Sequence, residues 1–290
     1  MNSYLRDFSE ASWQLYSMLT PDRATMAEYI AARLADERDR LKQEFSRPGR
    51  VPAFALDDVL PEEWARQIYD AFPEQGRMSF KNSIKERKHV AAQMNEHAPI
   101  LEESVYAFQQ PDVLKMIAEI TGLQALEPDA ELYAGGISAM VKGSYLKPHL
   151  DNSHDSKQER YRALNLLYYV TPDWKSEFGG ALEVWDEGPS GAPRPFPALF
   201  NRLVVMATNR ISWHSVSEIV ADERRCCVSN YYFSKVPPDV EEYFHATSFR
   251  GRPGELVKDL VMRGDNALRT AVLKLTGTKV YQNPHRYKRD

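Results

Sequence analysis

The sequence predicts a mainly β fold, a sandwich or barrel flanked by helices. From Glu131 to Phe233 the chain consists of short runs rich in Val, Leu, Tyr and Ala, separated by turn signals such as Gly179-Gly180. Short strands at this spacing favour a sandwich or barrel over parallel βαβ units. Before this region, apolar residues recur at helical spacing. With 290 residues, 43% of them hydrophobic, the chain can bury one large domain or one and a half.

The region before residue 131 is predicted to be mostly helical. Its first helix is expected to begin after a Thr-Pro-Asp cap signal at 20–22 and to end near Phe45, where SRPGRVP follows. Met26, Ile30 and Leu34 form its apolar stripe. The other elements expected here are a short strand in FALDDVL, a helix over 61–72 and a helix over about 112–120.

The chain is expected to divide into three parts. Residues 1–130 form a helical region with one short strand that packs on the barrel, and residues 131–235 form the β core. Residues 236–290 form an extension with at least one helix, expected after the Gly-Asp-Asn signal at 264–266. Its aromatic and basic groups at 243–252 make it a candidate lid over a site or a subunit contact, with solvated surface as the alternative.

Charge and composition narrow the functional classes. Lys and Arg number 37 and Asp and Glu 41, giving a formal charge of -4 and a pI near 6.0, so no bulk attraction to nucleic acid or anionic membrane is expected. Cys226 and Cys227 are adjacent on a predicted strand and would point to opposite faces, which suits free thiols in a reducing compartment. No apolar run approaches the ~20 residues of a membrane span, and the N-terminal stretch is too polar for a signal peptide. We therefore expect a cytoplasmic protein.

The stretch GSYLKPHLDN at 143–152 carries two metal-capable side chains where a predicted strand ends. Residues two apart in an extended chain project to the same face, so His149 and Asp151 can reach one ion. His214, in ISWHSV, supplies a third ligand from the same β-rich region. Two imidazoles and one carboxylate are the facial triad of non-haem Fe(II) oxygenases. Zinc is the alternative, although the sequence has no hydrolytic zinc motif such as H-E-x-x-H.

Two adjacent arginines follow the third candidate ligand. Arg224 and Arg225 precede the strand-like run CCVSNYYF, and a guanidinium can bind a carboxylate bidentately. Because side chains alternate along a strand, only one of the two can point into a barrel. Such a residue is what a dicarboxylate cosubstrate would require.

In this order the motifs resemble those of the Fe(II)/2-oxoglutarate-dependent dioxygenases, specifically their prolyl 4-hydroxylase-like branch. The resemblance covers roughly residues 131–234 and consists of six features. They are H-x-D at 149–151, RALNLLYY at 162–169, FGGALEVW at 178–185, NRLVVM at 201–206, HSV at 214–216, and Arg225.

The resemblance implies a double-stranded β-helix, a cupin-like jelly roll, with the metal in the barrel mouth. It implies that His149, Asp151 and His214 bind Fe(II). In that family 2-oxoglutarate and O₂ are consumed, succinate and CO₂ are released, and a C–H bond is hydroxylated, with ascorbate as an aid. The acid at Asp151 favours hydroxylation over halogenation, because halogenating members replace it with a small residue.

The resemblance also assigns the cosubstrate site. Arg225 would hold the distal carboxylate of 2-oxoglutarate, because small or hydroxyl residues, here Cys227 and Ser229, follow this arginine at two and four positions in related enzymes. Tyr169 matches a position that often hydrogen-bonds the same carboxylate. Asn165 is expected to face the pocket on the same side as Tyr169.

Five further residues are candidates for the substrate pocket: Tyr145, Lys147, Arg162, Glu183 and Trp185. Tyr145 and Lys147 share a strand face with His149. Glu183 and Trp185 alternate along another predicted strand, and Arg162 could bind an anionic substrate. Core packing, solvent contact or a surface ion pair is the alternative for each of the five. His154 is expected to be a loop histidine outside the triad.

Three functions fit these residues. The first is an oxygenase acting on a small molecule such as an amino acid, a sugar or a natural-product intermediate, and it is the one we favour. The second is a hydroxylase of prolyl or other residues in a protein, and the third is a binding module that has lost catalysis. A nucleic-acid substrate is not expected, because Ser229 and Asn230 stand where the DNA-repair members of the superfamily carry a second arginine. A homodimer is a further possibility.

Overall fold

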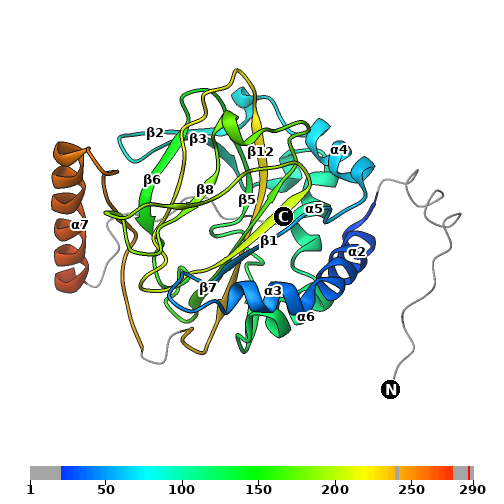
Figure 1. Ribbon diagram of the computed structural model, residues 1–290, viewed down its shortest axis with the longest axis horizontal. Helices are drawn as coiled ribbons and strands as arrows, with labels where there is room; N and C mark the ends of the chain where they lie inside the picture. Colours follow the sequence, from blue (N-terminus) through cyan, green and yellow to red (C-terminus); the bar gives the residue numbers. More distant parts are fainter. Residues whose placement is uncertain (1–20, 239–241, 277–286, 288–290) are drawn as a thin grey trace, which may run out of the picture.

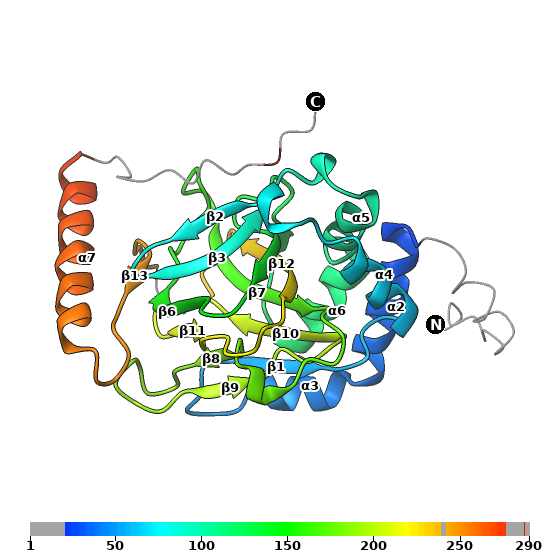
Figure 2. The same cartoon turned by 90° about the horizontal axis from the view of Figure 1, so that it is seen from above.

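The computed structural model describes residues 21–238, 242–276 and 287, with side chains of the last helix described to residue 268. One antiparallel sheet curls into a nearly closed barrel, with most helices gathered on one side and one helix standing apart on the other (Figures 1 and 2). The helices are α2 (Arg23–Asp36), α3 (Arg38–Phe45), α4 (Glu62–Asp70), α5 (Pro99–Ala107), α6 (Pro111–Thr121) and α7 (Leu256–Thr276). Short 3₁₀ turns cover Gln75–Arg77, Met94–Glu96 and Ser176–Phe178.

The strands come from the whole described chain. They are β1 (Ala53–Leu56), β2 (Ser79–Asn82), β3 (Glu86–Ala91), β4 (Leu126–Pro128), β5 (Gly136–Met140), β6 (Tyr145–Leu150), β7 (Tyr161–Tyr169), β8 (Leu182–Val184), β9 (Arg194–Phe196), β10 (Arg202–Ala207), β11 (His214–Val216), β12 (Arg225–Ser234) and β13 (Ser248–Phe249). Their order is β1-β10-β7-β12-β5-β3-β6-β11-β8-β9, with β2 on β3, β4 on β12 and β13 on β6.

Strand β3 joins the two walls of the barrel. Its end at His89–Ala91 pairs with β5 in the larger wall, and its start at Glu86–Arg87 pairs with β6 in the smaller wall. The antiparallel sheet forms a nearly closed barrel with flanking helices, which is the arrangement of a double-stranded β-helix core. The predicted fold class is therefore confirmed. Strands β1 to β4, which precede residue 131, are part of this sheet.

Alternation along the long strands separates two apolar cores. On β7, Leu164, Leu166 and Tyr168 face the helices and pack against the apolar stripe of α2. Tyr169 faces the other way and packs inside the barrel with Val204 of β10. Alternate residues thus have different neighbours, as expected for a sheet covered by helices on one face.

The first predicted helix is two helices. α2 ends at Asp36 and α3 begins at Arg38, with Glu37 between them at φ -103° and ψ 7°. The break turns the second segment toward β1, where the rings of Phe45 and Phe54 lie 6.1 Å apart. The N-cap is Asp22, which accepts a hydrogen bond from the Thr25 backbone at 2.8 Å.

Some elements outside residues 131–235, including strands β4 and β13, were absent from the sequence prediction, and the start of one helix was misplaced. The hairpin of β2 and β3 and the helix α5 were not predicted, although Pro99 occupies the first turn of α5, as helix-start rules allow. Helix α7 begins at Leu256, well before the predicted start. Gly264 lies inside it, with open space around its Cα, and a helix tolerates such a glycine at a cost of about 1 kcal/mol.

The C-terminal extension is attached to the barrel through β13 and several ion pairs. β13 pairs with β6, so that Phe249 lies opposite His149. Lys147 binds Glu255 at 2.6 Å, and Lys85 binds Asp265 at 2.5 Å. The opposite face of α7 exposes aliphatic side chains, including Leu256 at 82% and Leu260 at 71%. A subunit contact through this extension stays a prediction, as does the three-part division of the chain. Among the helices that the structure describes, none is long and apolar enough to cross a membrane.

Candidate metal and cosubstrate site

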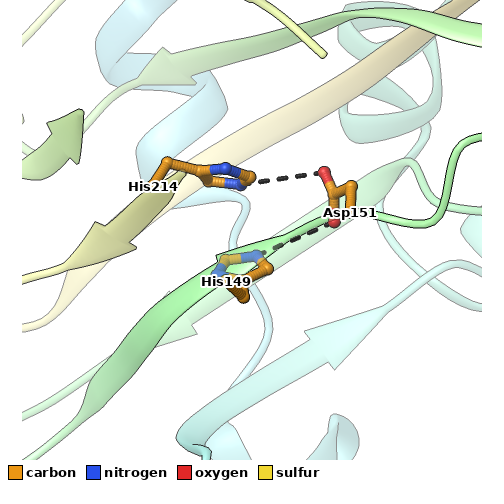
Figure 3. A group of neighbouring side chains, drawn as sticks. All are labelled: His149, Asp151 and His214. Carbon is orange, nitrogen blue, oxygen red and sulfur yellow. Dashed lines mark ion pairs between the residues drawn. The ribbon is translucent and has the colours of Figure 1, made fainter. Parts of the chain in front are cut away.

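Three side chains meet at the mouth of the barrel. His149 lies on β6, Asp151 follows the end of that strand, and His214 begins β11 (Figure 3). One carboxylate oxygen of Asp151 is 3.7 Å from Nε2 of His149, and the other is 3.7 Å from Nε2 of His214. One ligand atom from each residue lies within 4.8 Å of the others. The structure therefore brings together the three metal ligands predicted from the sequence.

Backbone carbonyls set the orientation of both imidazoles. Nδ1 of His149 lies 2.9 Å from the carbonyl oxygen of Lys147, and Nδ1 of His214 lies 2.9 Å from that of Ser212. A carbonyl only accepts, so each Nδ1 carries the hydrogen and each Nε2 presents its lone pair to the common point. This arrangement is typical of metal-binding histidines.

The charge state of the cluster suits a cation. Burial lowers the pKa of His149 to about 3 and also lowers the pKa of His214, so both rings are neutral near pH 7. Burial alone would raise the pKa of Asp151, but the charge of Arg162 brings it below its ordinary value, and the two imidazoles add to this effect at low pH, where they are protonated. Two neutral imidazoles and one carboxylate are the form in which these groups bind a metal.

A β-bulge in β7 turns Arg162 into the site. Tyr232 pairs with Leu164 and Phe233 pairs with Arg162, so Ala163 is the extra residue. The bulge places Arg162 on the same face as Asn165, which strict alternation would not do. Arg162 is only 4% exposed, and its Nη1 lies 3.3 Å from Asp151, so its ion pair is buried and not at the surface.

The cluster opens into a cavity of about 800 Å³. One side is formed by the β2–β3 hairpin, which contributes Lys81, Lys85 and Lys88. Next to the hairpin, the wall is formed by residues from 244–249 and by α7 through Val261, Met262 and Asp265. The cavity is thus built from the barrel, from the hairpin that was not predicted, and from the C-terminal extension.

Arg225 lies deep in this cavity, while Arg224 points away from it. Arg225 is 3% exposed, donates to the Gly180 carbonyl at 2.7 Å, and has an Nε hydrogen without a partner among the residues that the structure describes. Its guanidinium lies 5.0 Å from the centre of the Tyr169 ring. Arg224 instead donates to the carbonyl of Pro73 on the outer face of the sheet. A Cβ atom at residue 180 would lie only 2.9 Å from Cδ of Arg225, so the glycine makes room for the arginine side chain.

Two polar atoms of β7 also lack partners. The Tyr169 hydroxyl and Oδ1 of Asn165 are buried and make no hydrogen bond among the described residues. The Tyr169 ring lies beside the Arg225 guanidinium, whereas Asn165 lines the cavity opposite Tyr231, six residues along β12 from Arg225. Unpaired buried groups are uncommon in folded proteins, and they indicate a ligand site where they adjoin a cavity. Arg225 and the Tyr169 hydroxyl can donate to an anionic cosubstrate, while Oδ1 of Asn165 can only accept a hydrogen bond.

Two of the predicted pocket residues lie outside the cavity because of a second bulge. His214 pairs with His149 and Val216 pairs with Leu146, so β6 has one more residue than β11 in this interval. Leu146 therefore lines the cavity beside His149. Tyr145 instead donates to the backbone of Ser83, and Lys147 binds Glu255. The prediction that Tyr145 and Lys147 share the face of His149 is wrong.

Glu183 and Trp185 do not line the cavity either. On β8, Leu182 faces the cavity, so Glu183 faces outward by alternation. Glu183 accepts hydrogen bonds from Ser215 at 2.7 Å and from Arg252 at 2.6 Å. The Trp185 indole is 2% exposed and donates to the Ser215 hydroxyl at 2.8 Å. These residues hold the C-terminal extension against the outside of β8 and β11.

Sequence reasoning missed His245 as a cavity residue. It lies in the extension, lines the cavity, and has both ring nitrogens buried without a partner among the described residues. The sequence offered a weak signal in its Tyr-Phe-His run at 243–245. His154 also lines the cavity, but it takes no part in the triad cluster.

Comparisons with known proteins agree with this geometry. Residues 135–233 match the sequence model of the 2OG-Fe(II) oxygenase superfamily. Mouse prolyl 3-hydroxylase OGFOD1 is 30% identical over 148 residues, which cover 44% of this chain and 26% of the mouse protein. The Xenopus laevis protein of the same name is 32% identical over 84 residues, which cover 27% of this chain and 16% of the frog protein. A prolyl 4-hydroxylase structure from Phytophthora capsici aligns with a TM-score of 0.51 at 16% identity, over 84% of this chain and 75% of that one.

These matches differ in what they support. The chain spans only about a quarter of the mouse relative, so the likeness concerns the shared oxygenase region. The Phytophthora structure supports the fold. The family match includes both candidate histidines, Asp151 and Arg225. The region that holds the candidate site is therefore similar to the 2OG-Fe(II) oxygenase superfamily, and the curated relatives that it matches are named prolyl 3-hydroxylases.

Proposed function

We propose that this protein is an Fe(II)- and 2-oxoglutarate-dependent oxygenase that hydroxylates an unactivated C–H bond of a small molecule. The observation that carries the proposal is Arg225, a buried guanidinium in the same cavity as a two-histidine, one-aspartate cluster. Its Nε finds no partner in the described part of the chain. Burial of a charge is unfavourable unless an opposite charge completes the site. A dicarboxylate that also reaches the metal satisfies both parts of the cavity.

The chain's own residues would bind and orient the reactants. His149, Asp151 and His214 would hold Fe(II) on one face, which leaves the opposite face open. Arg225 would pair with the distal carboxylate of 2-oxoglutarate, and the Tyr169 hydroxyl beside it would donate a hydrogen bond to the same carboxylate. The amide N–H of Asn165 could donate to another part of the cosubstrate. With Fe(II) bound at the triad, O₂ would be the oxidant, and 2-oxoglutarate would supply two of the four electrons as it is converted to succinate and CO₂.

A small-molecule substrate is supported by the dimensions of the cavity. A volume of about 800 Å³ falls within the 300–1,000 Å³ of typical small-molecule sites. A prolyl residue in a protein is the second candidate, because the mouse and frog relatives are named prolyl 3-hydroxylases. A binding module without catalysis is disfavoured, since the metal cluster and Arg225 occur together.

Succinate release tests the proposal. Purified protein with Fe(II), ascorbate and 2-oxoglutarate should form succinate slowly alone and faster with the substrate, while Asp151→Ala should form none. Free amino acids and sugars would be compared with proline-containing peptides, and stimulation by peptides alone would favour the second candidate. Absence of 2-oxoglutarate turnover in the wild type would remove the oxygenase proposal and favour the binding module.

A further inference from the structure

The C-terminal extension places an aromatic ring directly against one of the candidate metal ligands. The Phe249 ring is stacked on the His149 imidazole, with centroids 5.1 Å apart and planes at 14°. Phe249 also lines the cavity and is only 9% exposed. It lies on β13, outside the residues 135–233 that match the oxygenase family. The extension, and not the matched region, therefore supplies this contact.

The pairing of β13 with β6 explains why the two rings lie so close. Phe249 is opposite His149, and the next residue, Arg250, donates its N–H to the Pro148 carbonyl at 2.8 Å. Phe249 and His149 are therefore a non-hydrogen-bonded pair, the kind in which opposite side chains are nearest. The N–H and carbonyl of Phe249 are bound instead by the Asn266 side chain, which accepts at 3.1 Å and donates at 2.7 Å. Helix α7 thus fixes the backbone from which the ring projects.

The β2–β3 hairpin contacts the same ring. The Lys85 ammonium lies 5.4 Å from the centre of the Phe249 ring, which is a cation–π contact. Lys85 is in turn held by its ion pair with Asp265 of α7, at 2.5 Å. Contacts from the hairpin and from α7 together limit the movement of the Phe249 ring.

The fixed ring matters because the His149 imidazole can turn about its Cβ–Cγ bond. The hydrogen bond from Nδ1 to the Lys147 carbonyl favours one orientation, but the net stabilisation from a single bond of this kind is small. A half-turn would break it and would put a C–H where Nε2 faces Asp151. The His214 ring, with its centroid 4.1 Å away, and the Phe249 ring leave the imidazole little room for this turn.

We propose that Phe249 is a positioning residue for the metal site, whose ring keeps Nε2 of His149 directed at the point shared with Asp151 and His214. The inference rests on the proposed oxygenase function, because it treats His149 as a ligand of Fe(II). It gives the C-terminal extension a role in metal binding in addition to forming a wall of the cavity. Loss of the ring would let the imidazole turn, and the affinity of the site for a divalent metal would fall.

Two measurements on the same variants test this role. Long-range proton–nitrogen NMR spectra of the metal-free protein report which nitrogen of each histidine carries the hydrogen, and calorimetric titration with Co(II) reports the metal affinity. Phe249→Ala removes the ring, and Phe249→Tyr keeps it; Phe249→Leu replaces the alanine variant if that variant does not fold. Phe80→Ala is the matched control, because Phe80 stacks on His89 with centroids 4.6 Å apart and planes at 21°, and His89 is not in the metal cluster.

In the wild type we expect the His149 hydrogen on Nδ1 alone, as its bond to the Lys147 carbonyl requires. In Phe249→Ala both tautomers of His149 should appear, and Co(II) should bind about two- to tenfold more weakly, the range for loss of one aromatic pair. Phe249→Tyr and Phe80→Ala should leave the His149 tautomer and the Co(II) affinity unchanged.

The role of Phe249 is wrong if a folded Phe249→Ala keeps the single tautomer and the wild-type Co(II) affinity, or if Phe80→Ala has the same effect on His149. A wild type that binds no Co(II) would instead refute the proposed function. The two failures are distinguishable, because the tautomers of the metal-free protein report on His149 whether or not a metal binds.

Discussion

Replacing Arg225 by alanine should reduce the affinity for 2-oxoglutarate far more than replacing its neighbour Arg224. Arg225 is 3% exposed and lies in the cavity beside the buried Tyr169 ring. A carboxylate bound there would be shielded from water. Truncating one partner of such a buried charge pair costs about 2–5 kcal/mol, which corresponds to roughly 30-fold to several thousand-fold in Kd.

Arg224 provides the matched control within the same strand. It donates to the Pro73 carbonyl at 3.0 Å and lies over the Tyr69 ring at 5.8 Å, both outside the cavity. Its removal should change 2-oxoglutarate binding by less than about threefold, because it makes no contact with the site. Arg225→Lys keeps the charge but not the two-pronged geometry, and we expect it to fall between wild type and Arg225→Ala.

The assay is a calorimetric titration of 2-oxoglutarate into the Mn(II)-loaded protein, with the melting temperature of each variant measured beforehand. The melting temperature matters because the Gly180 carbonyl loses its hydrogen-bond donor in Arg225→Ala. A large loss of 2-oxoglutarate affinity confined to Arg224→Ala would refute the assignment of Arg225 as the carboxylate-binding residue. A folded Arg225→Ala variant that binds 2-oxoglutarate as tightly as the wild type would refute it as well.

Three further predictions follow from the site and its walls. Activity of the apoprotein should return with Fe(II) and ascorbate, and recovery with Zn(II) alone would contradict the oxygenase assignment. His154→Ala should retain metal that His149→Ala loses, as measured by metal content after dialysis; equal loss in both would place His154 among the ligands. Partial burial by itself raises the pKa of Glu255, but the hydrogen bonds from Lys147, from the Arg252 backbone and from Lys258 together outweigh it and lower that pKa to about 2. Glu255 therefore contributes stability above its ordinary pKa of 4.5, and this contribution is lost as the pH falls toward 2. Lys147→Met should make the melting temperature depend less on pH in this range. An unchanged dependence in the variant would argue against the Lys147–Glu255 pairing.

The sequence predicted the parts of the site that depend on chemistry or regular geometry. His149 and Asp151 were chosen as candidate ligands because residues two apart in extended chain share a face, and they lie together. Arg225 was preferred to Arg224 for the small residues that follow it, and the regular β12 directs it inward. The apolar stripe of α2 is also buried as predicted.

The errors occur where the backbone departs from regular alternation. Tyr145 and Lys147 were placed beside His149 by counting in twos, and a bulge in β6 invalidates that count. Arg162 was a pocket candidate with a surface ion pair as the alternative, and it lies in the cavity because of a bulge in β7 that the sequence did not reveal. A bulge is decided by pairing between strands that are distant in sequence, so it has no reliable local signal. The position of His245 in the cavity wall was not predicted for a similar reason, since only the tertiary pairing of the C-terminal extension brings it there.

The bulge in β6 has a second structural effect that links the metal cluster to the cavity walls. It contains Pro148, which has no N–H to give to a neighbouring strand. The backbone around Pro148 forms hydrogen bonds with two other segments. The N–H of Lys147 donates to the carbonyl of Lys85 in the hairpin, and the Pro148 carbonyl accepts from the N–H of Arg250 in the extension, both at 2.8 Å. Both contacts lie within two residues of His149. The irregular turn of the strand thus directs a candidate ligand into the barrel and also holds the hairpin and the extension at its mouth, which explains why the cavity walls come from segments so distant in the chain.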